Sequence, residues 1–257
     1  MREPPDLRGS VTVRVYAELN DFLPGELRGR EFPCVLNGGP SVKHVVESLG
    51  IPHTEIEVLL VNGTSVGFGH RLRDGDRVAV YPVFESLDAG PLVRLRPRPL
   101  REVRFVLDVH LGKLALLLRL LGFDAAFPGD VPDEELVRIS VGEHRILLTR
   151  DTMLLKRGAV THGCYVHGTD PEAQTAEVLD RLDLRRAVRP FTRCPSCGAL
   201  LADVAKERIE DRLEPLTRRY YDEFRECTAC ARVYWKGSHW NALLATLRRL
   251  GVDPREE

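Results

Sequence analysis

Two closely spaced pairs of cysteines constrain the fold of this chain more than any other feature. They are Cys194-x-x-Cys197 in "RCPSCGALL" and Cys227-x-x-Cys230 in "ECTACARVYWKGSHW". A CxxC turn places two thiolates on one side of a metal ion, and two such turns complete a tetrahedral Zn²⁺ site. Because no coordination position stays open, we expect a structural zinc whose removal unfolds this part of the chain. A redox-active CxxC is the alternative, although it leaves the second pair unexplained.

The interval between the pairs, "DVAKERIEDRLEPLTRRYYDEF", is long for a zinc ribbon, and we expect it to form an inserted hairpin or helix. We predict a zinc ribbon at residues 191–240 and a C-terminal helix and tail at 241–257. Cations and aromatic rings are interleaved here, as on surfaces that bind single-stranded nucleic acid. Alternatively, at least half of the rings fill the ribbon core and dock it to its neighbour. The residues concerned are Arg218, Arg219, Tyr220, Tyr221, Phe224, Tyr234, Trp235, Lys236, His239 and Trp240.

The composition excludes several classes of protein. The 257 residues are 43% hydrophobic and 29% charged with a net charge of -1, so the whole molecule is not a polyanion binder. No apolar run approaches the roughly 20 residues of a membrane span, and "MREPPDLRGS" lacks the apolar core of a signal peptide. We therefore expect a cytoplasmic protein with no membrane partner, where reducing conditions favour metal over disulfide at the cysteines. The oligomeric state does not follow from the sequence.

Residues 10–86 have the pattern of a small α+β domain. Strands are predicted at "VTVRVYAEL", "EVLLVNG" and "DRVAVYPVF", and "SVKHVVESLG" predicts a capped amphipathic helix that ends at Gly50. The stretches "VLLVNG" and "RLRDGDRVAVYPVF" resemble the ubiquitin-like β-grasp domains, which include sulfur carriers with a C-terminal Gly-Gly. Here Gly38-Gly39 lies inside the domain. We therefore expect a module that binds a protein partner, with a role in sulfur transfer as the alternative.

Residues 87–101 form a predicted Pro/Arg-rich linker, whose arginines either contact a phosphate backbone or are simply solvated. Strands then alternate with helices over residues 102–190. This alternation predicts a parallel α/β sheet covered on both faces. In such sheets ligands gather at the carboxyl ends of the strands.

Asp108 and Asp151 each come just after an apolar run of this region, in "VRFVLD" and "RILLTRD". Two carboxylates at one sheet edge repel each other unless a cation lies between them. Hard oxygen ligands select Mg²⁺ or Mn²⁺, ions that activate water and stabilise charge on a phosphate. Asp133 either faces the same site or caps a helix, and Asp151 could also cap a helix that starts in "TMLLKR".

Three stretches, "FVLDVHLGKLALLLRLLGFDAAF", "PDEELVRIS" and "RILLTRDTMLLKR", resemble the Mut-seven C-terminal RNase family, a branch of the PIN-like nucleases. The resemblance covers most of residues 102–240. That family often carries an N-terminal ubiquitin-like domain and a C-terminal zinc ribbon. The resemblance implies that Asp108, Asp133 and Asp151 are the catalytic acids and bind Mg²⁺ or Mn²⁺. By motif, the basic residues near this edge are Lys113, Arg119 and Arg150.

We predict that these three basic residues bind the substrate, although Arg150 could instead pair with one of the acids. The resulting hypothesis is a metal-dependent ribonuclease whose zinc ribbon helps to hold RNA. The alternative is a non-catalytic RNA-binding or ribosome-associated adaptor with a degenerate nuclease fold, in which the acids pair with Arg150 and Lys113. The RNA target and the choice between endo- and exonucleolytic cleavage do not follow from the sequence.

Overall fold

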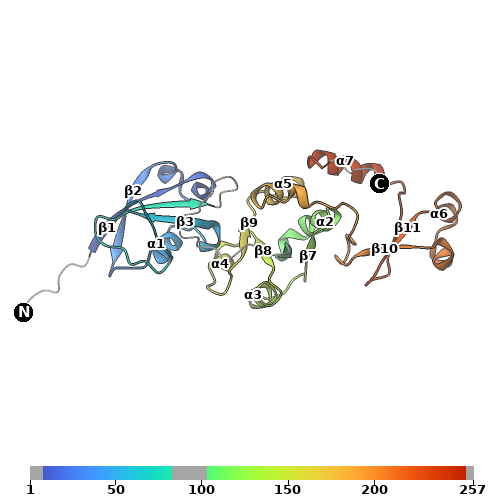
Figure 1. Cartoon of the computed structure of the whole chain (residues 1–257), viewed down its shortest axis with the longest axis horizontal. Helices are drawn as coiled ribbons and strands as arrows, with labels where there is room; N and C mark the ends of the chain where they lie inside the picture. The colour runs from blue at the N-terminus through green and yellow to red at the C-terminus, as the bar shows by residue number, and fades with distance from the viewer. Residues whose placement is uncertain (1–7, 83–102, 253–257) are drawn as a thin grey trace, which may run out of the picture. The chain divides into compact units, whose positions relative to one another are not determined.

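The computed structural model describes residues 8–82 and 103–252 (Figure 1). The chain forms two compact units. Unit 1 comprises Met1–Arg101 and Asp151–Tyr165, and unit 2 comprises Glu102–Arg150 and Val166–Glu257. The predicted linker lies outside the described residues, so the predicted domain boundaries remain predictions. No helix in the described ranges is both long enough and apolar enough to cross a membrane.

Unit 1 contains a mixed five-stranded sheet with the strand order β2-β1-β5-β3-β4. β1 pairs antiparallel with β2 and parallel with β5, and β5 pairs antiparallel with β3. The predicted α+β arrangement of the N-terminal domain is confirmed. Its strands are Arg8–Val15 (β1), Glu31–Asn37 (β2), Ile56–Val61 (β3), Thr64–Ser65 (β4) and Arg77–Pro82 (β5). Its helices are Val42–Ser48 (α1) and the 3-10 segments Ala17–Phe22, Gly25–Leu27 and His53–Glu55.

Helix α1 forms where the sequence predicts it. The Ser41 hydroxyl accepts a hydrogen bond from the amide of His44 at 3.3 Å and so caps the first turn. Valines of α1 are buried in the domain core. The helix is followed by Gly50 at φ 101°, a conformation that glycine adopts without strain.

Most of the strands and helices that follow the predicted β–α alternation lie in unit 2. The four-stranded sheet has the order β7-β6-β8-β9, and β6 pairs parallel with both β7 and β8. Its strands are Arg104–Leu107 (β6), Asp124–Ala126 (β7), Ile146–Thr149 (β8) and Gly163–Tyr165 (β9), the last within unit 1. The helices are Gly112–Leu120 (α2), Asp133–Gly142 (α3), Thr152–Leu155 (α4, in unit 1) and Pro171–Arg181 (α5), with 3-10 segments at Val109–Leu111 and Arg185–Ala187.

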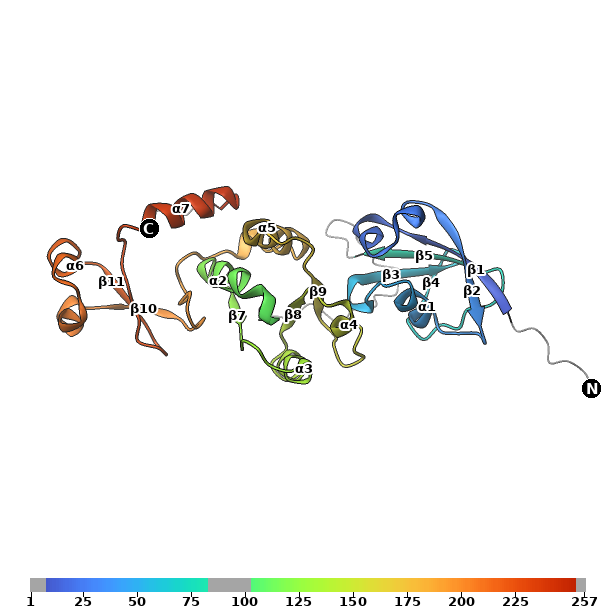
Figure 2. The same ribbon diagram turned by 180° about the vertical axis from the view of Figure 1, so that it is seen from behind.

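The parallel sheet is covered on both faces, as predicted. Helix α3 contacts β6 and β8, while α2 contacts β7 and α5. Figures 1 and 2, drawn from opposite sides, place α3 on one side of these strands and α2 with α5 on the other. The strands accordingly bury apolar side chains: Phe105, Val106 and Leu107 of β6 are fully buried.

The C-terminal part of unit 2 is a small antiparallel sheet with the order β10-β11-β12. The long interval between the cysteine pairs is mostly helical, one of the two forms predicted for it. The strands are Leu201–Val204 (β10), Phe224–Cys227 (β11) and Val233–Tyr234 (β12). The helices are Pro215–Tyr220 (α6), Trp240–Arg249 (α7) and the 3-10 segments Lys206–Arg208 and Glu210–Arg212.

Helix α7, the predicted C-terminal helix, is docked within unit 2. Arg249 forms a two-pronged ion pair with Glu172 of α5, with N···O distances of 2.7 and 2.6 Å. The ring of Trp240 packs on Phe191 with centroids 4.2 Å apart. Leu247 is fully buried. The helix is therefore held by packing at both ends and by one ion pair.

Candidate metal centre and acidic strand end

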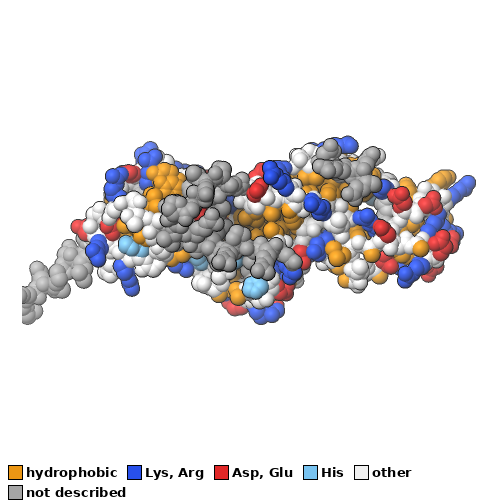
Figure 3. All heavy atoms as spheres, in the orientation of Figure 1, with side chains coloured by type: hydrophobic (Ala, Val, Ile, Leu, Met, Phe, Trp, Pro, Cys, Tyr) orange, Lys and Arg blue, Asp and Glu red, His pale blue; other side chains and the backbone are white. Residues whose placement is uncertain are grey.

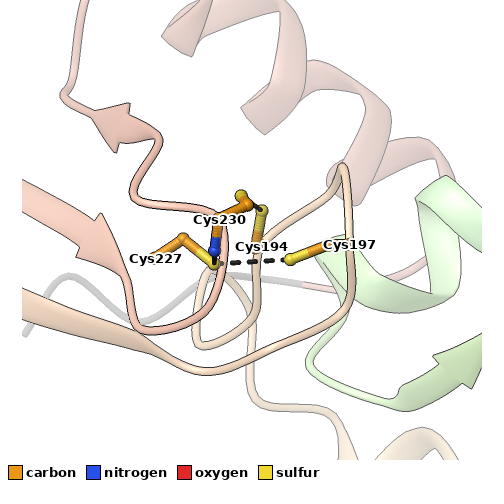
Figure 4. A group of neighbouring side chains, drawn as sticks. All are labelled: Cys194, Cys197, Cys227 and Cys230. Atoms are coloured by element: carbon orange, nitrogen blue, oxygen red, sulfur yellow. Dashed lines mark hydrogen bonds between the residues drawn. The ribbon is translucent and has the colours of Figure 1, made fainter.

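The four predicted cysteine ligands come together at one point (Figure 4). Their sulfur atoms all lie within 4.8 Å of one another, with Cys194 and Cys230 3.7 Å apart and Cys197 and Cys227 3.4 Å apart. Tetrahedral Zn²⁺ with Zn–S bonds of about 2.3 Å requires sulfurs about 3.8 Å apart. The donor set and its spacing therefore fit a closed tetrathiolate metal site.

Both cysteine turns are built in the same way. The amide of Gly198 donates to the carbonyl of Cys194 at 2.8 Å, and the amide of Ala231 donates to the carbonyl of Cys227 at 3.1 Å. The fourth residue after each first cysteine has a positive φ, 84° at Gly198 and 54° at Ala231. The amide of Cys230 also points at the sulfur of Cys227, 3.4 Å away. Such N–H groups stabilise a thiolate.

The surroundings of the cysteines favour a charged sulfur at Cys194. Burial opposes ionisation, but hydrogen bonds from the Tyr234 hydroxyl, at 3.0 Å, and from backbone amides outweigh it and lower the pKa of Cys194 to about 6. Burial and the neighbouring thiols raise the pKa of Cys197 to about 12. Tyr234 is one of the predicted aromatic residues, and its hydroxyl supports the metal centre.

Arg119, for which the sequence predicts substrate binding, donates hydrogen bonds to backbone carbonyls in the structure, and its predicted role stays a prediction. It is only 6% exposed, although it lies on α2. Its Nε donates to the carbonyl of Ala125 at 2.8 Å, and its Nη1 donates to the carbonyls of Ser196 at 2.7 Å and Pro195 at 3.3 Å. Burial lowers the pKa of this guanidinium, and the Cys197 thiol opposes that shift. Through these bonds Arg119 joins the first cysteine turn to the α/β domain.

Arg193 adds to the same junction and was missed by the sequence analysis. Its Nη1 donates to the carbonyl of Gly198 at 2.8 Å, its Nε donates to the carbonyl of Gly122 at 3.2 Å, and its Nη2 lies 3.6 Å from Asp124. Gly122 itself has φ 94°, and a Cβ there would lie 2.1 Å from the carbonyl oxygen of Arg189. The cysteine centre is thus fixed to the α/β domain at close range.

Asp108 follows β6 directly, at the carboxyl end of a strand, as predicted. β6 and β8 pair in parallel with Leu107 opposite Leu148, so Asp108 and Thr149 come next on the two strands. The buried Thr149 hydroxyl donates to Asp108 Oδ2 at 2.7 Å. Thr149 thus fixes the orientation of the carboxylate, a role that the sequence analysis did not assign to it.

Asp133 and Asp151 each lie at the start of a helix. Pro132 occupies the cap position of α3, so Asp133 is the first helical residue and not the cap. Asp151 caps α4, and its Oδ1 accepts a hydrogen bond from the amide of Met153 at 2.7 Å. Asp151 belongs to unit 1, whereas Asp108 and Asp133 belong to unit 2. The predicted set of three acids therefore stays a prediction.

We asked where three or more His, Cys, Asp or Glu side chains bring their ligand atoms within 4.8 Å of one another. In residues 8–82 and 103–252, the four cysteines form such a group. Lys113 is exposed in the first turn of α2, and Arg150 is exposed directly after β8. Their exposure is compatible with substrate contact. Their predicted roles stay predictions.

These features define a class of protein with three domains in succession along the chain. They are a β-grasp-like domain, a parallel α/β domain and a small antiparallel domain with a four-cysteine centre. A family model described as the Mut7-C RNAse domain matches residues 103–247, and a second, the Mut7-C ubiquitin domain, matches residues 9–88. The chain belongs to the Mut7-C RNase domain family and carries the Mut7-C ubiquitin domain at its N-terminal side. The resemblance seen in the sequence is confirmed.

Among solved structures, the chain is similar to the crystal structure of SAMP1 from Haloferax volcanii. The two are 19% identical with a TM-score of 0.25, over 31% of this chain and 100% of that one. A comparison with curated proteins found no match.

Proposed function

We propose that the chain is a metal-dependent ribonuclease that hydrolyses phosphodiester bonds of RNA. Membership of an RNase domain family supports this reaction. The observation that carries the proposal is the carboxylate of Asp108, oriented by Thr149 at the carboxyl end of β6. Asp108, Asp133 and Asp151 would hold Mg²⁺ or Mn²⁺, since carboxylates are the ligands that these ions prefer.

When bound, a divalent ion at these acids would supply an activated water and neutralise the charge that develops on the phosphate. The chain itself provides the orientation. Thr149 and the amide of Asp108, which donates to the carbonyl of Leu148 at 3.1 Å, fix the acid relative to the sheet. The exposed Lys113 and Arg150 would bind the phosphate backbone of the substrate.

Substitution of the acids tests this proposal. We expect purified protein to cleave single-stranded or structured RNA with Mn²⁺, and Asp108→Asn and Asp151→Asn to lower the rate by roughly 10³-fold, the scale of several kcal/mol of lost charge stabilisation. Because asparagine also caps helices, Asp151→Asn keeps the α4 cap, and a loss of activity reports on the charge. The rate is measured with a labelled RNA over a range of Mn²⁺ concentrations.

Asp170→Asn is the matched control, since Asp170 caps α5 through the amide of Ala173 at 2.8 Å in the same way. If all variants cleave at the wild-type rate, a contaminating nuclease is responsible and the proposal is wrong. Calorimetric titration with Mn²⁺ then separates a ribonuclease from the adaptor, which would bind RNA but show no Mn²⁺ binding that depends on Asp108 and Asp151.

For the cysteine centre we propose Zn²⁺ with a structural role. Four cysteine thiolates with sulfurs at tetrahedral spacing form a closed donor set that is typical of zinc. We further propose that the surrounding zinc ribbon helps to hold RNA. On α6, Tyr220 is 66% exposed, and the guanidinium of Arg219 lies 5.5 Å from its ring centroid. The face drawn in Figure 3 shows charged side chains of both signs interspersed with hydrophobic ones over this part of unit 2.

Only some of the aromatic rings are free to contact RNA. Phe224 is buried, Tyr234 binds the sulfur of Cys194, and Trp240 packs on Phe191, whereas Tyr220 and Trp235 are exposed. The sequence also allowed a second interpretation, in which many of these rings fill the core or dock the ribbon. That interpretation holds for Phe224, Tyr234 and Trp240.

Removal of the Tyr220 ring tests the RNA surface. We expect Tyr220→Ala to weaken binding of single-stranded RNA by about 1–3 kcal/mol, the value of one base stacked on an aromatic ring. Binding is measured by fluorescence anisotropy with labelled RNA at fixed salt. Leu216→Ala, at an exposed position on the same helix, removes an apolar side chain that cannot stack. Equal affinities of Tyr220→Ala and the wild type would exclude a stacking role.

A further inference from the structure

The β-grasp sheet has one buried face and one open face. Along β1, Val11, Val13 and Val15 are buried in the core that also takes up the valines of α1. The intervening residues of β1 and of its parallel neighbour β5 belong to the other face, and their side chains are partly or fully exposed. They are Thr12, Arg14 and Tyr16 along β1 and just after it, and Arg77, Ala79 and Tyr81 along β5. The open face therefore carries charge and aromatic rings in the middle of the sheet.

Three side chains of the open face pack on one another. In the parallel register Val15 lies opposite Val80, so Tyr16 and Tyr81 come next on the two strands. Their rings are stacked, with centroids 4.3 Å apart and planes 12° apart. The guanidinium carbon of Arg14 lies over the Tyr16 ring, 5.0 Å from its centroid. This cation–π contact holds Arg14 in place and leaves the N–H donors at the edge of the guanidinium available to a ligand.

A hollow with a volume of about 390 Å³ lies on the same face. Arg14, Tyr16 and Arg77 line it together with the small residues Thr12, Gly63 and Ala79. Ala79 is the direct neighbour of Arg14 on β5, so its short side chain leaves room beside the guanidinium. The volume falls in the range of about 300–1,000 Å³ that is typical of small-molecule sites, which suits a single nucleotide.

The charged side chains of the hollow favour an anion. Arg77 pairs with Glu31 at 2.8 Å, and 69% of the Arg77 side chain is exposed. Two guanidinium groups thus line the hollow beside this one carboxylate, so its lining keeps a net positive charge. Because a guanidinium has five N–H donors, Arg77 can hold Glu31 and a phosphate oxygen at the same time. Burial and the Tyr16 hydroxyl raise the pKa of Tyr81, so that this neighbouring phenol adds no negative charge at neutral pH.

We propose that the open face of the β-grasp sheet binds single-stranded RNA, with a base stacked on the Arg14 guanidinium in the hollow and a phosphate held by Arg77. Bases of single strands stack on aromatic rings and on guanidinium planes, and positive side chains follow the backbone. Membership of an RNase domain family supports RNA as the ligand. The inference takes RNA from the proposed function, but it concerns binding and not cleavage.

Two substitutions of the same residue test the stacked base. Arg14→Lys keeps the charge but loses the planar surface, whereas Arg14→Ala loses both. Lys43→Ala is the matched control. Lys43 also lies over an aromatic ring, 5.9 Å from the centroid of Phe68, but it belongs to α1, which packs on the buried face of the sheet. Binding of a short fluorescein-labelled oligouridylate to the full chain is measured by anisotropy without Mn²⁺, so that metal-dependent cleavage does not contribute.

We expect both Arg14 variants to bind the oligouridylate roughly 5- to 150-fold more weakly, the fold-change that corresponds to about 1–3 kcal/mol for one stacked base. Lys43→Ala should bind like the wild type. Arg77→Gln should reduce the slope of log affinity against log salt concentration by about 0.7, the value of one phosphate contact with a single strand. Since Arg14 and Arg77 are exposed, the urea midpoint of each variant should match that of the wild type.

Cross-linking locates the RNA independently of affinity. A 4-thiouridine oligonucleotide is irradiated with the full chain, and the cross-linked peptides are identified by mass spectrometry. We expect cross-links within β1, β3 or β5, the strands that contribute residues to the hollow. They should be lost in Arg14→Ala and kept in Tyr220→Ala, which alters the separate RNA surface proposed for the zinc ribbon.

The outcomes separate this inference from the proposed function. Wild-type affinity in Arg14→Ala, or cross-links that never fall in these three strands, overturns the inference, and a protein partner becomes the occupant of the open face. Wild-type affinity in Arg14→Lys also overturns it, because charge without a planar surface would then be enough. A chain that binds the oligonucleotide at this face but cleaves no RNA with Mn²⁺ contradicts the proposed function alone.

Discussion

A strong zinc chelator is expected to unfold residues 191–240 while unit 1 stays folded. The apolar core of this part of the chain is too small to be stable alone: besides Cys194 and Cys227, its buried apolar side chains are Ile209 and Phe224. Its three strands have four, four and two residues. Binding of zinc to such a site contributes about 10–16 kcal/mol to the free energy of folding. Without it the sheet cannot offset its conformational entropy.

Tryptophan fluorescence measures this unfolding, because both tryptophans of the chain, Trp235 and Trp240, lie in or beside the ribbon. We expect one zinc per chain in the wild type and in Cys34→Ser, which removes a cysteine of the β-grasp domain, and none in Cys227→Ser. An emission spectrum that does not change while the zinc content falls to zero would refute the structural role of the metal.

Arg119→Met is expected to destabilise unit 2 by about 3–5 kcal/mol, since hydrogen bonds from a charged group contribute about 1.5–3 kcal/mol each and buried acceptors are left unpaired. Methionine fills similar space but cannot donate to the carbonyls of Ala125, Pro195 and Ser196. The free energy of unfolding is measured with urea, followed by tryptophan fluorescence.

Arg138→Met is the control for this substitution. Arg138 lies on α3 with 71% of its side chain exposed and pairs with Glu135, so its loss should leave the free energy of unfolding close to the wild-type value. If Arg119→Met keeps wild-type stability but binds RNA more weakly, Arg119 contacts the substrate, as the sequence motif first suggested, and the docking role is wrong.

The sequence predicts well those elements whose apolar residues recur with a clear period or whose helix begins with a clear N-cap residue. Helix α1 follows from Ser41 and its buried valines, and α5 follows from Asp170 before a proline. The cysteine centre follows from spacing alone, because a CxxC turn has a fixed geometry whatever lies between the pairs. The apolar runs of β6 and β8 predicted a parallel sheet, and hence the position of Asp108 at a strand end.

Among the strands that the sequence did not predict, β2 and β7 escaped for physical reasons. β2 contains Pro33, which argues against a strand, but β2 is at the edge of its sheet, where a missing N–H is tolerated. β7 has only three residues, too few for an alternating pattern to appear. Both strands are defined by pairing with β1 or β6, which are distant in the sequence.

The roles of individual side chains were harder to predict than the fold. Nothing near Arg119 in the sequence indicates that its partners are Pro195 and Ser196, more than 70 residues away. Threonine is a common residue in β-strands, so Thr149 does not stand out in the sequence. Only the parallel register of β6 and β8 brings its hydroxyl to Asp108. Such contacts depend on three-dimensional packing, which a single sequence does not display.

The packing of Asp151–Tyr165 in unit 1 has a consequence for how the two domains can be inherited or recombined. A crossover in the stretch between the two matched regions would separate them in sequence. The segment would then lose the hydrogen bonds that join its Val160 carbonyl and Tyr165 amide to the buried side chains of His53 and Glu55. A viable chimera has to exchange the β-grasp domain together with Asp151–Tyr165. The unit of exchange in this protein is therefore discontinuous along the chain.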